Sequence, residues 1–196
     1  ARPGVLHEGL GGWHTPGNAD LIAQFVRYAR LCFERFGHLV PTWFTFNEPW
    51  TFTVGGYSAG NHAPGCVPFQ PKGGPCEHGD THPYIVAHNV LLAHGRAVAL
   101  YRGDFARSMG GRISITLPCE IGTAASDAPE DIRAAERANE FFLGWWLEPL
   151  VTGEYPATMR EFVGARLPRF TREESSLLHS SIDVLSLNHY STHLVS

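Results

Sequence analysis

Charged residues are scarce in this chain of 196 residues. They make up 17% of the sequence, against roughly a quarter in an average globular domain. The formal net charge of −4 leaves no excess of basic residues, which argues against a nucleic-acid partner. No apolar run approaches the roughly 18 residues that a membrane-spanning helix requires, so no membrane contact is expected.

Hydrophobic and aromatic residues are plentiful. They account for 43% and 12% of the chain, with five tryptophans, which is enough to build a sizeable core. Low charge with many aromatic rings is typical of a large buried barrel, and also of a cleft that stacks on sugar rings or other flat apolar faces. The first four residues resemble neither a signal peptide nor a start site, and no feature assigns a compartment or an oligomeric state.

The four cysteines leave alternatives open. Cys32 and Cys119 are expected to be buried thiols, whereas Cys66 and Cys76 flank a loop rich in glycine and proline and could form a disulfide or stay reduced. A zinc site is a further alternative, but the gap of ten residues is unlike the short paired spacing of structural zinc sites. The disulfide or reduced thiols are favoured, and no metal or cofactor is expected. The residues of the zinc alternative are Cys66, Cys76, His78 and His82.

Two further histidines, His88 and His94, lie six residues apart in a helical segment. They would not share one helix face as a pair of metal ligands does, so we expect both to be partly buried helix residues.

Hydrophobic periodicity predicts alternating helices and strands. Asp20 is expected to cap the first helix and Gly37 to end it. Thr171 and Glu174 have the spacing of a capping box. The predicted order is a helix over 20–37, a strand over 40–46, a long loop over 51–82, a helix over 83–102, a strand over 112–117, a helix from 129 to about 145, two shorter helices, and a strand over 183–187 that ends in Asn188, His189 and Tyr190.

This alternation indicates parallel βαβ units and an α/β fold. Three strands with no closing partners would leave open sheet edges, which native domains avoid. A complete barrel of eight strands takes about 250 residues. We therefore expect the chain to be the middle of a larger barrel, and its open edges predict aggregation of the isolated chain.

The rest of the chain is organised around residues 43–50, an aromatic strand that ends at a carboxylate. Asn47 and Glu48 follow the strand, and Pro49 cannot continue the ladder because it has no N–H. In an α/β barrel, polar side chains at this end of a strand face the catalytic cleft. Alternatively, Asn47 caps a helical turn with Pro49 near its first position, and Glu48 complements the helix dipole.

A serine esterase is a competing hypothesis. Residues 56–60 fit the Gly-x-Ser-x-Gly pattern around Ser58, and Asp183 and His189 follow in the order of a catalytic triad. This nucleophile motif requires a strand before the serine and a helix directly after it. Pro64 and other turn-forming residues follow instead, which disfavours the esterase.

Several motifs, in order, resemble those of glycoside hydrolase family 1, the family of retaining β-glucosidases. The similarity covers nearly the whole chain. It is carried by Thr45-Phe46-Asn47-Glu48-Pro49, which resembles the acid/base motif, and by Gly11-Gly12-Trp13, Gly56-Tyr57, Ala63-Pro64-Gly65, Ala87-His88-Asn89, Phe142-Leu143-Gly144-Trp145, Thr152-Gly153-Glu154-Tyr155-Pro156 and Leu187-Asn188-His189-Tyr190.

The resemblance implies a (β/α)8 TIM barrel of which this chain supplies strands four to six, with residues 1–196 forming a partial catalytic domain that lacks strands one to three and seven to eight. It implies that Glu48 protonates the departing glycosidic oxygen and then activates water. Asn47 would bind the sugar 2-hydroxyl, Tyr190 would hold the nucleophilic carboxylate, and Asn188 would line the same pocket. A small-molecule β-glycoside is the implied partner.

One element of the family pattern is missing. Retaining hydrolysis needs a second carboxylate about 5–5.5 Å from the first, and the family's Thr-Glu-Asn-Gly-like segment that supplies it is absent from this sequence. We therefore expect the 196 residues alone to be inactive. A sugar-binding relative without catalysis is the alternative. The sequence assigns neither the glycone nor the aglycone.

Overall fold

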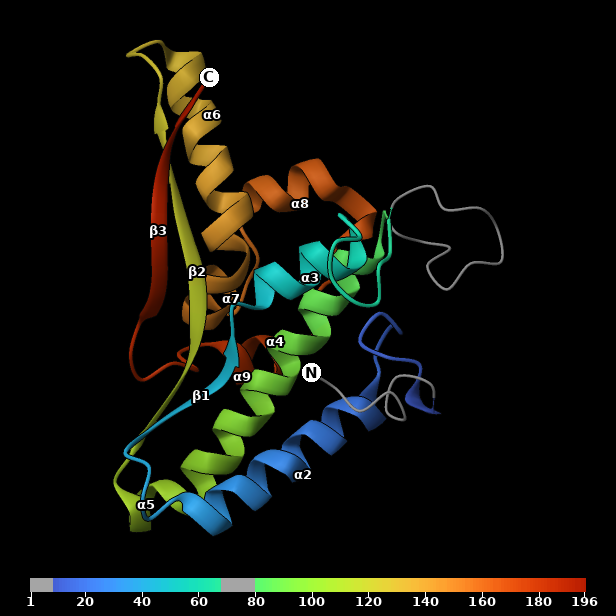
Figure 1. The fold of residues 1–196 in the computed structure, drawn as a ribbon, viewed down its shortest axis with the longest axis vertical. Coiled ribbons are helices and arrows are strands. Elements are labelled where there is room, and N and C mark those ends of the chain that lie inside the picture. Colours follow the sequence, from blue (N-terminus) through green and yellow to red (C-terminus); the bar gives the residue numbers. More distant parts are fainter. Residues whose placement is uncertain (1–8, 68–79) are drawn as a thin grey trace.

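Three parallel strands form a single sheet in the order β1–β2–β3. They are β1 (Thr42–Asn47), β2 (Arg112–Ala124) and β3 (Ser186–Val195). The computed structural model describes residues 9–67 and 80–196, and within these ranges no further strand pairs with the outer edges of β1 and β3. In Figure 1 the helices lie on one side of the sheet and its other side is open. The predicted α/β fold with a parallel sheet is confirmed.

The helices connect the strands in the predicted order. One helix precedes β1. A first group of helices follows β1, and a second group follows β2. They are α2 (Ala19–Phe36), α3 (Pro49–Tyr57), α4 (His82–Leu100), a π-helical turn (Tyr101–Phe105), α5 (Ala106–Met109), α6 (Pro129–Asn139), a second π-helical turn (Glu140–Gly144), α7 (Trp145–Thr152), α8 (Ala157–Val163), a 3-10 turn (Gly164–Arg166) and α9 (Arg172–Leu178).

Helix α4 is the centre of the core. Fourteen of its residues are buried, because it packs against α2, α3, α9 and the strands β1 and β2 at once. The largest side chains that are fully buried beside it are Trp146, Tyr101 and Tyr155. None of the described helices is long and apolar enough to cross a bilayer.

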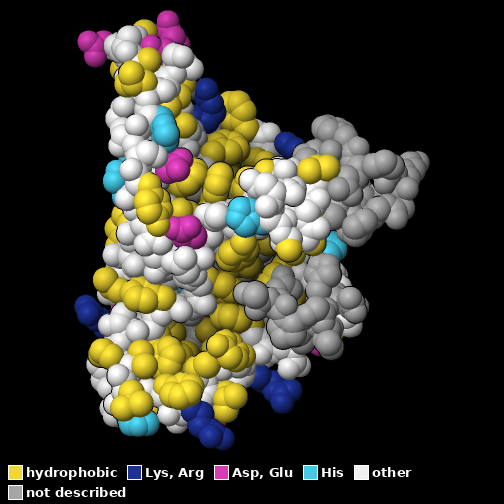
Figure 2. Space-filling model, viewed as in Figure 1, with side chains coloured by type: hydrophobic (Ala, Val, Ile, Leu, Met, Phe, Trp, Pro, Cys, Tyr) yellow, Lys and Arg dark blue, Asp and Glu magenta, His cyan; other side chains and the backbone are white. Residues whose placement is uncertain are grey.

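The edge strands of the sheet carry exposed apolar side chains. Phe44, Leu187 and Leu194, from the two edge strands, are exposed, Leu194 to 77%. Figure 2 shows hydrophobic side chains gathered over one face of the molecule, with few acidic groups among them. A face of this kind indicates a sheet that packs against further structure in a complete barrel.

Some predicted boundaries were wrong. Asn18, not Asp20, caps α2, because its side chain accepts from the Leu21 N–H. Strand β2 runs seven residues past the predicted end, to Ala124, despite Pro118, and the helix predicted to end near 145 continues to Thr152. The capping box at Thr171 and Glu174 is confirmed.

The start of the long predicted loop is helical. Helix α3 occupies residues 49–57, and 68–79 of the predicted loop lie outside the described residues. The glycines that suggested a loop serve close packing, since a Cβ at Gly56 would lie 2.7 Å from the Ala63 carbonyl oxygen. Glycine here lets the segment after α3 fold back against the helix.

Candidate active site

Glu48 stands at the junction between β1 and α3 with an unusual backbone. Its φ and ψ are 49° and 58°, in the left-handed region, which costs an L-residue other than glycine about 1–2 kcal/mol. Its N–H donates to the Thr116 carbonyl of β2 at 2.9 Å, and Pro49 begins the helix. Such an outlier, held by the surrounding structure, indicates a functional constraint.

The capping alternative is wrong for Asn47 and correct for Pro49. The N-cap position of α3 is occupied by Glu48, no side chain makes a cap hydrogen bond, and Pro49 is at the first helical position. The side chains of Asn47 and Glu48 are therefore available to groups on the neighbouring strands.

The four predicted site residues meet through hydrogen bonds. Oε1 of Glu48 accepts from Nδ2 of Asn188 at 2.9 Å and from the Tyr190 hydroxyl at 3.2 Å. The same Nδ2 donates to Oδ1 of Asn47 at 3.1 Å. Asn188 and Tyr190 point to the same side because they are two residues apart on β3. The structure thus brings together residues that are about 140 positions apart in the sequence.

The charge of Glu48 affects its tyrosine partner. Tyr190 is 75% exposed, yet its pKa is raised above the usual value of 10, first by repulsion from the Glu48 carboxylate and then by the hydrogen bond to it. The resemblance assigned Tyr190 to the nucleophilic carboxylate. Among the described residues, its hydroxyl donates to Glu48.

This coupling predicts a titration result. In Glu48→Gln the negative charge is removed, so Tyr190 is expected to ionise at lower pH than in the unmodified protein. Ultraviolet titration of tyrosinate, with Tyr190→Phe subtracted to isolate this residue, measures the shift. An unchanged Tyr190 titration would show that the two side chains do not interact in solution.

Thr51 is a site residue that the sequence analysis missed. Its hydroxyl lies 3.3 Å from Oε2 of Glu48, the carboxylate oxygen that Asn188 and Tyr190 do not contact. Its backbone N–H donates to the Glu48 carbonyl at 3.0 Å. The spacing Glu48-Pro49-Trp50-Thr51, with proline opening a helix, could have identified it, because residues three apart in the first helical turn are neighbours.

The esterase hypothesis is wrong. Ser58 ends helix α3, whereas the nucleophile motif needs a strand before it. Asp183 instead accepts from Arg102 and from the Ile113 N–H, and Nδ1 of His189 donates to the Cys119 carbonyl at 2.6 Å.

The cysteines are now partly assigned. Cys32 and Cys119 are free thiols, half-buried and buried respectively. Cys66 is buried and bonded in a disulfide, so its thiolate is not a zinc ligand. Cys76 and His78 lie outside the described residues, and the Cys66–Cys76 pairing stays a prediction. Within the described ranges, no three His, Cys, Asp or Glu side chains gather as a metal-binding group.

A buried polar network links β1 and β2 to the segment before β3. His94 of α4 is fully buried; its Nε2 donates to the Ser181 carbonyl at 3.0 Å, so its Nδ1 accepts from the Thr45 hydroxyl at 2.7 Å. The pKa of His94 is lowered to about 4, mainly by burial. The Arg102 charge also lowers it, while the hydrogen bond to Ser181 and the charge of Asp183 act in the opposite direction. His94 is therefore neutral near pH 7. The prediction that His94 and His88 are only partly buried was wrong, since they are 0% and 8% exposed.

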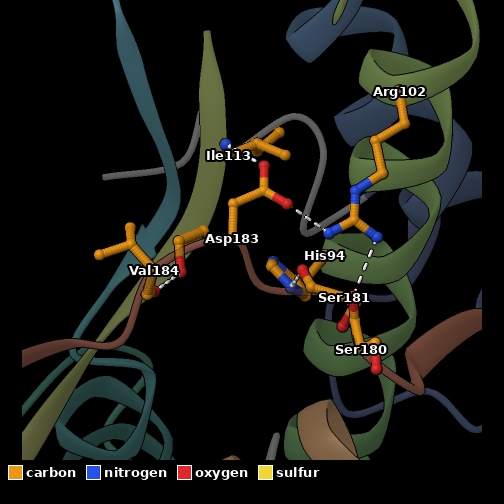
Figure 3. A network of polar contacts seen from close by, with 8 residues as sticks. His94, Arg102, Ile113, Ser180, Ser181, Asp183 and Val184 are labelled. Carbon is orange, nitrogen blue, oxygen red and sulfur yellow. Dashed lines mark hydrogen bonds and ion pairs between the residues drawn. The ribbon is translucent and has the colours of Figure 1, made fainter.

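The other half of this network holds the segment before β3. Asp183 accepts from Arg102 at 2.5 Å and from the Ile113 N–H at 2.8 Å, while Arg102 also donates to the Ser180 carbonyl at 2.9 Å (Figure 3). These contacts link the π-helical turn after α4 to β2 and to the start of β3. They fix where β3 begins, and with it the position of Asn188 and Tyr190.

A carboxylate held by an amide and a phenol at the ends of parallel strands, with helices packed outside them, is the arrangement expected in part of a (β/α)8 barrel. The family model described as "Glycosyl hydrolase family 1" matches residues 2–196. The chain belongs to glycosyl hydrolase family 1.

Named relatives agree with this assignment. Beta-glucosidase 40 of Arabidopsis thaliana is 44% identical over 195 residues, covering 97% of this chain and 37% of the relative. Beta-glucosidase 24 of Oryza sativa subsp. japonica is 44% identical over 196 residues, covering 98% and 38%. The chain therefore spans less than two fifths of the length of these curated relatives.

Solved structures match the fold. The rice Os3BGlu6 beta-glucosidase superposes with a TM-score of 0.91 at 38% identity, covering 98% of this chain and 40% of that one. The beta-glucosidase from Trichoderma harzianum gives a TM-score of 0.88 at 38% identity, covering 98% and 38%. The predicted partial TIM barrel is confirmed.

Proposed function

We propose that this chain is the central part of a retaining β-glucosidase catalytic domain in which Glu48 is the general acid and base. It would supply barrel strands four to six, and the strands before and after it would come from outside residues 1–196. The observation that carries the proposal is the Glu48 carboxylate at a strained strand–helix junction, hydrogen-bonded by Asn188 and Tyr190. A purely structural role would not require a carboxylate at a strained backbone position with two side-chain hydrogen-bond donors.

The chemistry follows from what each side chain can do. Glu48 would protonate the glycosidic oxygen as it leaves and then remove a proton from the attacking water. Asn47, 3.1 Å from Asn188 and exposed, would donate its amide to the sugar 2-hydroxyl, and Asn188 would orient both neighbours. A second carboxylate from outside the chain would be the nucleophile, with Tyr190 turning to it when it is present.

Relatives support the covalent route and a small β-glycoside as substrate. A mutant of the rice Os3BGlu6 enzyme is described in a covalent complex with Glc, which fits a glycosyl-enzyme intermediate. The matches also include furcatin hydrolase of Viburnum furcatum and an aphid myrosinase. Because relatives with such different names share the fold, we propose a glycoside substrate without assigning its aglycone.

Two measurements test the proposal. The full-length gene product should hydrolyse an aryl β-glucoside with retained anomeric configuration, followed by proton NMR of the first-formed sugar. The purified 196-residue chain should show no turnover, because its sequence lacks the segment that would supply the nucleophilic carboxylate. An inverted product would contradict the retaining mechanism. Clear turnover by the 196-residue chain, abolished in Glu48→Gln, would contradict the need for an outside nucleophile.

A further inference from the structure

The two oxygens of the Glu48 carboxylate have different surroundings. Oε1 accepts hydrogen bonds from Asn188 and Tyr190, at 2.9 and 3.2 Å, whereas Oε2 has one neighbour, the Thr51 hydroxyl at 3.3 Å. Both hydrogens of Asn188 Nδ2 are used, because the second goes to Oδ1 of Asn47. An amide nitrogen cannot accept a hydrogen bond, so a proton on Oε1 could be received only by the Tyr190 hydroxyl. In the proposed complete site that hydroxyl turns to the nucleophile, which leaves Oε1 with the Asn188 N–H alone.

The Thr51 hydroxyl can serve either protonation state. A threonine hydroxyl has one hydrogen to donate and two lone pairs to accept. It can therefore donate to an ionised Oε2 and accept from a protonated one by rotating about one bond. Its position is fixed by the first turn of α3, where the Thr51 N–H donates to the Glu48 carbonyl at 3.0 Å.

We propose that Oε2 is the oxygen of Glu48 that carries the transferred proton, and that Thr51 is a positioning residue that keeps it there. The proton leaves Oε2 for the glycosidic oxygen as the bond to the sugar breaks, and Oε2 later takes a proton from water. Asn188 holds Oε1 throughout. This inference rests on the proposed role of Glu48.

The experiment uses Thr51→Val in the full-length gene product, because valine keeps the shape and removes the hydroxyl. Thr51→Ser restores a hydroxyl. Thr53→Val is the matched control: it makes the same change on the same helix, at a buried side chain whose Oγ1 has no hydrogen-bond partner within the described residues. Each variant is assayed on β-glucosides whose leaving groups differ in how much they need protonation.

A lost hydrogen bond to a charged group at this length is expected to lower kcat/KM of Thr51→Val about 3- to 10-fold for an alkyl glucoside. The leaving group of a dinitrophenyl glucoside needs no proton. For this substrate the rate constant of the step that releases dinitrophenolate should fall by less than about 2-fold. Thr51→Ser and Thr53→Val should stay near the unmodified enzyme on both substrates.

Two results would overturn the positioning role of Thr51. One is an equal loss on both substrates, which would indicate a general structural defect, and the other is unchanged activity of Thr51→Val. Failure of the proposed function would look different: Glu48→Gln would keep full activity on the alkyl glucoside. The two failures are therefore distinguishable.

Discussion

Glu48→Gln in the full-length gene product is expected to lower kcat/KM for an alkyl β-glucoside by about 10²- to 10⁴-fold, the usual contribution of a general acid. Glutamine has nearly the same shape and keeps an oxygen that can accept from Asn188 and Tyr190, as Oε1 does now. It has no acidic proton to give. The decrease in kcat/KM therefore reflects the lost proton transfer more than a change in geometry.

The dependence on the leaving group separates chemistry from binding. An activated aryl glucoside forms the glycosyl-enzyme without protonation, so its first step should be much less affected, and intermediate should accumulate as a burst of released phenol. Stopped-flow absorbance measures both phases. Glu154→Gln is the control, because this exposed carboxylate pairs with Arg160 away from the site. Equal losses for both substrates would contradict the acid role.

Acidification is expected to destabilise the fold through His94. In the folded protein His94 stays neutral down to a pKa of about 4, whereas the unfolded chain takes up the proton near 6.5. Between these pH values the unfolded state binds more protons than the folded state, so lowering the pH shifts the equilibrium toward the unfolded state. The free energy of unfolding should decrease by about 3 kcal/mol over this interval and, for this group, no further below it.

His94→Gln tests the origin of this loss. Glutamine can keep a donor near the Ser181 carbonyl and does not titrate, so the variant should be less stable than the unmodified protein near neutrality, by about 1–3 kcal/mol. Its stability should also depend less on pH. His88, whose pKa is lowered mainly by burial, acts in the same direction, so the double variant should be flatter still.

Urea unfolding followed by tryptophan fluorescence, repeated across this pH interval, measures both effects. Phe33→Leu is a useful control. Phe33 is buried among apolar side chains of α2, the end of α4 and β2, so the substitution should lower stability without changing its pH dependence. An unmodified protein with the same stability throughout the interval, or a His94→Gln variant with an unchanged slope, would contradict the assignment to His94.

The sequence predicted the elements well because the strands and most helices have strong periodicity. It also located the polar end of β1, since Pro49 ends the ladder at a fixed place. It missed α3, because the buried positions of this helix include a threonine and two glycines and so show no hydrophobic period; the segment after the helix packs on the glycines. It ended β2 at Pro118, although the strand continues there beside a shift in register with β3.

The four candidate site residues could be named from the sequence, but their contacts with one another could not. Asn47 and Glu48 were marked by their place in the chain, and Asn188 and Tyr190 by resemblance. No local pattern reveals that Asn188 bridges Asn47 and Glu48, or that His94 connects Thr45 to Ser181, 87 residues away from the histidine. Such pairings depend on the register between strands, which only the folded chain establishes.

The sheet places its strands in the order in which the chain is made, β1, β2, β3. Each strand therefore joins the edge left by the one before it, and none has to be inserted between two that are already paired. During synthesis the barrel can grow by addition at a single advancing edge, with one helical connection closed at each step. Only the final pairing, between the last strand and the first, joins distant parts of the chain, and such non-local pairings are the slow ones. In a complete barrel we therefore expect closure, and not growth of the sheet, to limit how fast the proposed active site is assembled.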